Sequence, residues 1–288
     1  MLGNVFSPYY AFARRHNPAE PLNHCAINVA LYGPRSKHWA MTERPRHDIQ
    51  RTPIRLTIGP SSVSCDAKSI TFMIDEVCVP LPTRIKGRVR VFPSGMNAIP
   101  TALHPAGLHW WLPIAPSARV EVDFDDPRKT WTGDGYLDCN FGQQPLEAAF
   151  KQWNWARGQT KQGSVILYNV ETREGDRISL ARLYDMSGRM HTLPPRGEAK
   201  LPNTRWHIKR KINSDDDTQP RILKTFEDTP FYARSLIETT LFGSRTTMVH
   251  ESLCLDRFAN PVIRSMLPFR MPRWRHSKKP RPSEGGTK

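Results

Sequence analysis

Short runs rich in valine, isoleucine, threonine and phenylalanine, each bounded by proline, glycine or other turn-forming residues, recur along the whole chain. Runs of this length and composition are typical of antiparallel β-strands. The 26 prolines disfavour a helical bundle, because proline interrupts helices. We therefore predict an all-β chain with strands at Ile54–Ile58, Ile70–Ile74, Arg88–Phe92, His109–Ile114, Arg119–Phe124, Val165–Val170, Arg177–Tyr184, Ala233–Phe242 and Thr246–Leu255.

One segment, from Pro145 to Arg157, has the pattern of a helix, with proline at a suitable first position. Its apolar residues at helical spacing are Leu146, Ala149, Phe150 and Trp153. We place a domain junction beside this helix, because 288 residues suffice for two β domains. The predicted division is residues 1–158, residues 159–273 and a basic, proline-rich, disordered tail at 274–288.

Several glycine- and proline-containing stretches predict turns between the strands. Ala115-Pro116-Ser117 separates two of the runs, and the glycines at 133 and 135 also suit a tight turn. Gly243-Ser244 lies between two long strand-like runs and is the clearest hairpin signal in the chain.

The charge and the cysteines limit the partners and the compartment. The net charge of +15 attracts anionic surfaces, either nucleic acid or the acidic face of a membrane. No window approaches the roughly 18 apolar residues that a membrane helix needs, so membrane contact would be peripheral. The five cysteines are odd in number and show no CxxC spacing, which favours reduced thiols in a cytoplasmic compartment over zinc or disulfides.

Two stretches place a polar group and an aromatic ring on one face of a strand. In WTGDGYLDCNFG, Tyr136 and Asp138 are two apart, and in LHWWLPIAP, His109 and Trp111 are two apart. Residues two apart on a strand point to the same side of the sheet. If both faces point into one apolar cavity, an acid, an imidazole and two aromatic rings converge there.

An acid, an imidazole and two aromatic rings in one apolar cavity are suited to protonate an alkene. Burial raises the pKa of a carboxyl above its reference of about 3.9, and a carboxyl that stays protonated acts as a general acid. Aromatic faces stabilise a nearby cation by about 1–2 kcal/mol when desolvated. Spacing alone also allows a second interpretation, in which Asp138 is a hydrogen-bonded carboxylate at a strand end and His109 and Trp111 are core residues.

Nine blocks resemble the carotenoid 1,2-hydratases of photosynthetic bacteria, and they occur from residue 6 to residue 273 in the order of that family. They are FSPYYAFARR, PLNHCAINVALYG, WAMTER, IDEVCVPLP, WLPIAP, WTGDGYLDCNFGQQPLEAAFKQWNW, EDTPFYARSLIETTLFG, HESLCLDRF and LPFRMPR. The resemblance implies a lipocalin-like fold of two antiparallel β-barrel domains, the first of which carries the catalytic residues. The family usually has more apolar sequence ahead of FSPYY, so we expect this chain to begin inside its first strand.

The resemblance also implies a cofactor-independent hydro-lyase that hydrates the C1–C2 double bond of neurosporene, lycopene and related acyclic carotenoids. Its proposed acid falls on Asp138, and Tyr136, His109 and Trp111 fall on the other residues implicated in activity. In the expected mechanism Asp138 protonates C2 and leaves a tertiary cation at C1. Water then attacks C1, and the Asp138 carboxylate or His109 accepts its proton. No metal or other cofactor is expected.

The substrate is a long polyene that resides in the bilayer, so we expect a cytoplasmic protein held against the inner or photosynthetic membrane. The basic surface and the segment Phe269–Arg275 are candidates for contact with anionic lipid. Other enzymes of carotenoid biosynthesis are expected partners. Nucleic acid is not, because no DNA- or RNA-binding signature occurs.

Two other functions share some of these features. A non-catalytic lipocalin-like carrier of an apolar ligand would have the same cavity but no need for a buried acid. A glycoside hydrolase needs paired carboxylates, and Asp134 and Asp138 are close in sequence without further support as a pair. Glu227-Asp228 is interpreted as a structural motif at a strand entry, paired with Arg234.

Overall fold

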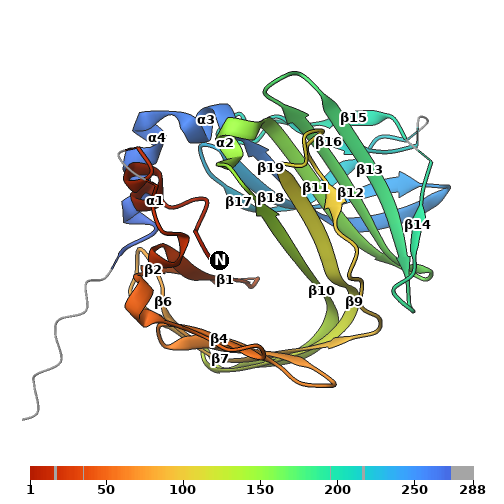
Figure 1. The fold of residues 1–288 in the computed structure, drawn as a ribbon. Helices are drawn as coiled ribbons and strands as arrows, with labels where there is room; N and C mark the ends of the chain where they lie inside the picture. Colours follow the sequence, from red (N-terminus) through yellow and green to blue (C-terminus); the bar gives the residue numbers. More distant parts are fainter. Residues whose placement is uncertain (16–17, 35, 195, 216–217, 274–288) are drawn as a thin grey trace, which may run out of the picture.

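The computed structural model describes residues 1–15, 18–34, 36–194, 196–215 and 218–273, and two large antiparallel sheets form most of it (Figure 1). The first sheet has the strand order β10-β9-β7-β6-β5-β4-β3, with β8 beside β9. Its strands are β3 (Ile49–Arg51), β4 (Arg55–Ile58), β5 (Ser61–Cys65), β6 (Ile70–Val77), β7 (Arg84–Pro93), β8 (Thr101–Ala102), β9 (His109–Asp126) and β10 (Lys129–Gly142).

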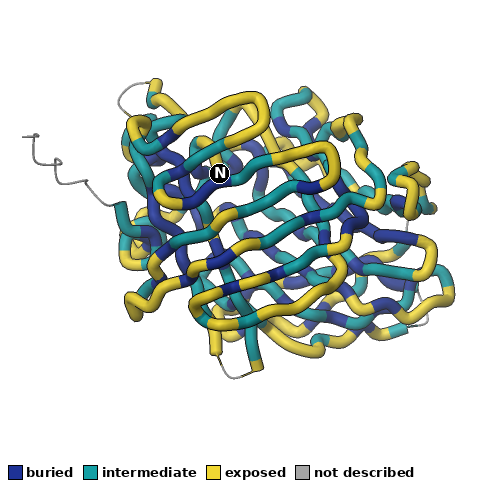
Figure 2. Tube along the Cα trace, turned by 90° about the horizontal axis from the view of Figure 1, so that it is seen from below, coloured by how far each residue is buried: buried dark blue, intermediate teal, exposed yellow. Residues whose placement is uncertain are grey.

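The second sheet has the order β14-β13-β12-β11-β19-β18-β17. Its strands are β11 (Phe150–Thr160), β12 (Gly163–Thr172), β13 (Arg177–Asp185), β14 (Met190–Thr192), β17 (Arg221–Asp228), β18 (Tyr232–Leu241) and β19 (Ser244–Cys254). Two further pairs complete the strands, β1 (Cys25–Tyr32) with β2 (Lys37–Arg44) and β15 (Glu198–Leu201) with β16 (Arg210–Asn213). Buried and half-buried positions alternate along β18, as expected for a strand with one face in the core, whereas β12 is buried along almost its whole length (Figure 2).

The two large sheets meet where β9 and β10 lie against β11 and β12. Trp111 of β9 packs on Tyr168 of β12 with ring centroids 5.2 Å apart, and Tyr136 of β10 packs on Trp155 of β11 at 5.5 Å. These side chains belong to one apolar core cluster, together with residues of the short helices. The site predicted from the sequence therefore lies at the junction of the two sheets.

The helices are short and gather beside the β1–β2 pair (Figure 1). They are α1 (Pro8–Ala13), α2 (Leu146–Ala149), α3 (Leu255–Ala259) and α4 (Pro261–Met266), with 3₁₀ turns at Pro21–Asn23, Arg46–Asp48 and Leu267–Phe269. Glu147 of α2 pairs with Arg264 of α4 at 2.5 Å and lies 4.0 Å from Arg14, which follows α1. The Glu147 carboxylate therefore connects α2 to α4 and to the residues that follow α1.

The predicted all-β class and lipocalin-like architecture are confirmed, but neither sheet closes into a barrel. In the described part of the chain the first sheet ends at β10 and β3 and the second at β14 and β17, without pairing between these edges. The division at residue 158 stays a prediction; β11 runs across this position and pairs with β12 and β19. The predicted tail, residues 274–288, lies outside the described residues.

The predicted helix from Pro145 to Arg157 is wrong beyond its first turn. Only Leu146–Ala149 is helical, and Phe150–Thr160 is strand β11. This strand pairs with β12 on one side and β19 on the other, so sheet hydrogen bonds along both edges outweigh the helical spacing of its apolar residues.

The predicted turn at Ala115-Pro116-Ser117 is also wrong, because β9 continues through it. Ala115 faces Leu137 and Ala118 faces Gly135, so β9 has one extra residue here and the ladder is irregular. A bulge accommodates proline, which has no N–H to donate. Gly133 and Gly135 lie within β10 rather than in a turn, and a Cβ at Gly135 would lie 2.3 Å from Cγ1 of Val120.

Two other local predictions have different outcomes. The hairpin between β18 and β19 is confirmed, with Phe242 and Gly243 at its tip, both at positive φ (55° and 74°). The expected first strand at the start of the chain is wrong. Pro8 begins helix α1, and the Ser7 hydroxyl caps it by accepting a 2.9 Å hydrogen bond from the Tyr10 N–H.

Two observations bear on the compartment and the membrane. Cys25, Cys65, Cys78, Cys139 and Cys254 are all free thiols. Within the described ranges, none of the helices has the length and apolar character required to cross a bilayer.

Candidate active site

Three of the four predicted site residues form one hydrogen-bonded cluster. The Tyr136 hydroxyl donates to Oδ2 of Asp138 at 2.8 Å. The indole Nε1–H of Trp111 donates to the same oxygen at 3.0 Å and also lies 3.0 Å from the Tyr136 hydroxyl. Tyr136 and Asp138 come from β10 and Trp111 from β9, as the two-residue spacing predicted.

Burial makes Asp138 a weaker acid than an ordinary aspartate. Removal of the carboxyl from water raises its pKa from 3.8 to about 6, against the hydrogen bonds from Tyr136 and Trp111, which lower it. The negative charge of Glu251 adds to the increase. The side chain is closely surrounded by protein, and the residue is half-buried rather than fully sealed from solvent. Asp138 can therefore hold a proton near neutral pH and donate it.

His109 lies on the same strand face but is not joined to the acid. Its ring packs on Phe150 at 4.9 Å between centroids, and in the described structure its Nε2 has no hydrogen-bond partner. Burial and the neighbouring His104 lower the pKa of His109 to about 4, so the imidazole is neutral at physiological pH. A Cβ at Gly142 would lie 2.3 Å from Nδ1 of His109, so this position of β10 must be glycine.

The second sheet supplies an aromatic wall opposite the acid. Tyr168 and Tyr184 pack on Trp111, at 5.2 and 6.4 Å between ring centroids. Trp155 packs on Tyr136. The hydroxyl of Tyr168 donates to Oδ1 of Asn140 at 3.0 Å, which fixes this ring against β10. Several π faces therefore surround the carboxyl, and they suit an unsaturated substrate or a developing cation.

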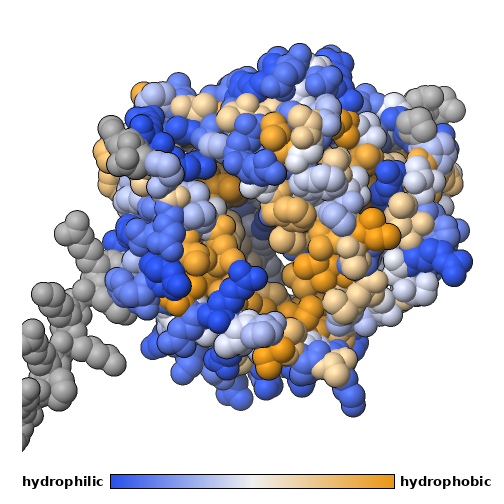
Figure 3. Space-filling view, in the orientation of Figure 1, coloured by the Kyte–Doolittle hydropathy of each residue, from blue (hydrophilic) through white to orange (hydrophobic). Residues whose placement is uncertain are grey.

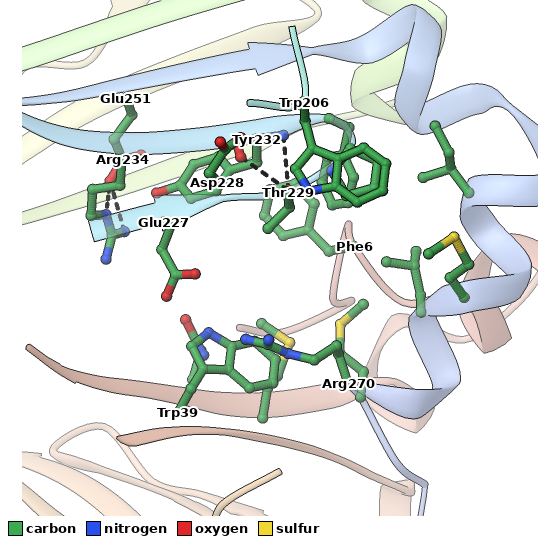
Figure 4. A pocket seen from close by; sticks show the side chains of 18 of the residues that line it. Phe6, Trp39, Trp206, Glu227, Asp228, Thr229, Tyr232, Arg234, Glu251 and Arg270 are labelled. Carbon is green, nitrogen blue, oxygen red and sulfur yellow. Dashed lines mark hydrogen bonds and ion pairs between the residues drawn. The ribbon is translucent and has the colours of Figure 1, made fainter. Parts of the chain in front are cut away.

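A pocket of about 400 Å³ opens between β1–β2, the β17–β18 turn and the C-terminal helices. Polar groups gather at one end, where Glu227, Arg234 and Glu251 lie, and apolar side chains including Phe6 and Trp206 line the other end (Figure 4). In the space-filling view a hollow opens near the centre of one face, and apolar residues flank it (Figure 3). An elongated apolar molecule with one reactive end suits this lining.

The sequence interpretation missed the polar network at the end of this pocket. Arg234 donates to Oε1 of Glu251 at 2.9 Å and to the Tyr32 hydroxyl at 3.1 Å. Tyr32 in turn donates to Glu227 at 3.1 Å, and Lys37 pairs with that carboxylate at 2.6 Å. Glu227 therefore lies on the pocket and faces Arg234 across the β17–β18 ladder, as expected, with the Tyr32 hydroxyl between the two side chains.

The second predicted carboxylate pair is not supported by the geometry. Asp134 is exposed on β10, four residues from Asp138, and lies outside the aromatic cluster. Glu251 is instead the carboxylate whose charge acts on Asp138.

Comparison with known proteins gives one consistent family. Residues 1–280 match the family model described as "Carotenoid hydratase CrtC". The chain is 52% identical over 274 residues to the acyclic carotenoid 1,2-hydratase of Thiocapsa roseopersicina, covering 95% of this chain and 68% of that protein. It is 44% identical over 277 residues to the enzyme of the same name from Rubrivivax gelatinosus, with 94% and 68% covered.

A solved structure supports the fold alone. The crystal structure of a protein designated AttH from Nitrosomonas europaea matches with a TM-score of 0.53 at 11% identity, covering 79% of this chain and 80% of that one.

Proposed function

Because the chain belongs to the carotenoid hydratase family CrtC, we propose that it hydrates the terminal C1–C2 double bond of acyclic carotenoids such as neurosporene and lycopene, with Asp138 as the general acid. The observation that carries this proposal is a carboxyl held by Tyr136 and Trp111 inside an aromatic cluster, where burial raises its pKa to about 6. The apolar pocket is lined by other residues, and Glu251, whose charge acts on Asp138, is the link between the two. A carrier of apolar ligands needs the pocket but not the acid. Incubation with lycopene in water enriched in heavy oxygen separates the two, because only a hydratase forms labelled alcohol.

The first step is proton transfer from Asp138 to C2. The π electrons of the double bond form the new C2–H bond, and C1 becomes a tertiary cation. Trp111 and Tyr136 hold the carboxyl in place through their hydrogen bonds. Their rings, with Trp155 behind Tyr136, stabilise the cation by about 1–2 kcal/mol. Water then forms a bond to C1 and must lose one proton to a base.

The rate should fall as the pH rises above about 6, because only the protonated form of Asp138 can donate. The groups that act on this carboxyl are Tyr136 and Trp111, which donate to it, and Glu251, whose charge opposes its ionisation. We expect kcat/KM to decrease about tenfold per pH unit on the alkaline side. A profile measured on vesicle-incorporated lycopene checks this, and a flat profile up to about pH 8 would exclude Asp138 as the acid.

A surface beside the pocket suits contact with a bilayer. Val262 and Met266 of α4 and Phe269 of the following 3₁₀ turn are 70%, 45% and 80% exposed. Met266 and Arg270 also line the pocket, so this surface adjoins its entrance. We propose that these apolar side chains enter the lipid while basic groups face anionic headgroups, which brings the pocket to its membrane-resident substrate. Trp274 and Arg275, which belong to the segment expected to bind lipid, lie outside the described residues.

Replacing Phe269 by serine should weaken binding to anionic vesicles about tenfold, because burial of a phenylalanine side chain contributes about 1.5–3 kcal/mol. Vesicle sedimentation measures the change. The matched control is Ile99→Ser, another exposed apolar residue (75%) in the loop before β8, which should bind as the unchanged protein does. Equal binding by both variants would contradict docking through this surface.

A further inference from the structure

Glu251 lies on the inner face of the second sheet, in line with the aromatic wall. It faces Arg234 across the β18–β19 ladder and Trp155 across the β19–β11 ladder, and Trp155 in turn faces Tyr168 of β12. Directly opposed residues on neighbouring strands project to the same side of a sheet. Because Trp155 packs on Tyr136, this row borders the acid cluster.

The two carboxyl groups have opposite surroundings. Asp138 is bonded to neutral donors, and burial raises its pKa. Glu251 is paired with the guanidinium of Arg234, whose Nε and Nη2 lie 2.9 and 2.7 Å from the same oxygen, Oε1. A nearby cation favours the charged form of a carboxyl. One carboxyl is therefore held by neutral donors and the other by a cation, and two carboxyls in such different environments are suited to act as acid and base in one reaction.

Buried donors beside Glu251 provide a place for a water molecule. The Nε1–H of Trp155 and the hydroxyl of Tyr232 are buried and, within the described residues, have no hydrogen-bond partner. Burial first, and then the charge of the nearby Glu251, raise the pKa of Tyr232, so this hydroxyl lies beside the carboxylate. Unpaired buried donors are costly, and a polar site with two to four partners commonly holds water.

We propose that Glu251 is the base of the hydration step, which places it, rather than the Asp138 carboxylate or His109, as the acceptor of the proton. This rests on the proposed function. A lone pair of the water oxygen forms the bond to C1, one O–H bond breaks, and its proton passes to Oε2 of Glu251. The proton then returns to Asp138 through solvent, so the product differs from the substrate by one water molecule. Arg234 is a positioning residue that holds Oε1 of the carboxylate through its Nε and Nη2 groups.

The test is a comparison of Glu251→Gln with the unchanged enzyme in heavy water. If Glu251 acts after protonation, the variant still forms the cation, but capture by water slows about a hundredfold. The cation then loses a proton from C2 and returns to alkene, so deuterium should accumulate in recovered lycopene while little alcohol forms. Mass spectrometry of both compounds gives the ratio of exchange to hydration, which should rise by a similar factor.

The controls separate this proposal from the proposed function. Asp138→Asn should lose exchange and hydration together, and its result tests the acid independently. Glu238→Gln removes another arginine-paired carboxylate of the same sheet, outside the pocket, and should behave as the unchanged enzyme. Hydration by Glu251→Gln within about twofold of normal, or loss of exchange along with hydration in the folded variant, would overturn the role of Glu251. If this variant does not fold, E251Q/R234M, which removes both charges, carries the same test.

Discussion

Replacing Asp138 by asparagine should lower the rate of carotenoid hydration by about 10²–10⁴-fold, the usual contribution of a general acid. The amide keeps the size of the side chain and can still accept the hydrogen bonds of Tyr136 and Trp111, but it has no proton to give. Product formation from lycopene measures the loss. Asp134→Asn, on the same strand but exposed, is the matched control and should leave the rate unchanged.

The same variant should be at least as stable as the unchanged protein, which separates loss of the acid from loss of the fold. The pKa of Asp138 is higher in the folded state than its ordinary value, so the folded protein is destabilised by ionisation of this carboxyl as the pH rises from about 4 to above 6. We expect Asp138→Asn to gain about 1–2 kcal/mol near pH 8, after allowance for the partial access of solvent, and little near pH 4. Chemical unfolding at both pH values measures this difference, and an inactive, destabilised variant would leave the acid unsupported.

Part of the site could be predicted from the sequence, because residues two apart on a strand point to the same face of the sheet. The spacing of Tyr136 and Asp138 on one strand and of Trp111 on another placed three groups on matching faces, and all three meet in one cluster. The same rule placed His109 correctly on the face but could not show its contacts. Positions two apart on a strand are about 6–7 Å apart, so a shared face does not imply a shared hydrogen bond.

Glu251 was missed because its contacts with Arg234 and Trp155 are made across strands, and spacing within one strand does not show them. A hairpin with Gly243-Ser244 at its tip would set Arg234 opposite Leu253. The observed tip, Phe242 and Gly243, sets Arg234 opposite Glu251. Phenylalanine at positive φ is uncommon, so the sequence did not favour the observed turn. The register of a β-hairpin follows its turn, and a small error there changes every cross-strand pair.

The remaining errors arose where tertiary pairing outweighed local signals. The apolar residues of Phe150–Thr160 are spaced for a helix, yet strands on both sides fix this segment as the centre of the second sheet. Without that strand Trp155 would not reach Tyr136, and the wall opposite the acid would be incomplete. The position of β11 therefore depends on residues nearly a hundred positions away in β19, and no local pattern carries that information.

Replacing Arg273 by methionine should destabilise the protein by about 3 kcal/mol, at the lower end of the range for breaking a buried ion pair. Its partner Glu43 is 1% exposed on β2, and Arg273 also donates to the carbonyl oxygen of Asn23 at 2.9 Å. Loss of the guanidinium leaves the carboxylate buried beside His24, which lies 2.8 Å away and is its other side-chain partner among the described residues. The melting temperature should fall by about 6–12 °C.

This ion pair also holds one wall of the pocket, so its loss should affect substrate binding more than chemistry. The Glu43 N–H donates to the carbonyl oxygen of Pro272 at 2.9 Å, and the adjacent Met271 lines the pocket. We therefore expect Arg273→Met to raise KM while kcat changes little, because Asp138 lies on another strand. Arg221→Met, which breaks an exposed pair with Glu238, should cost less than about 1 kcal/mol. The double variant E43Q/R273M removes both charges and should recover much of the lost stability; if it is as unstable as Arg273→Met alone, the pair is not what holds this segment in place.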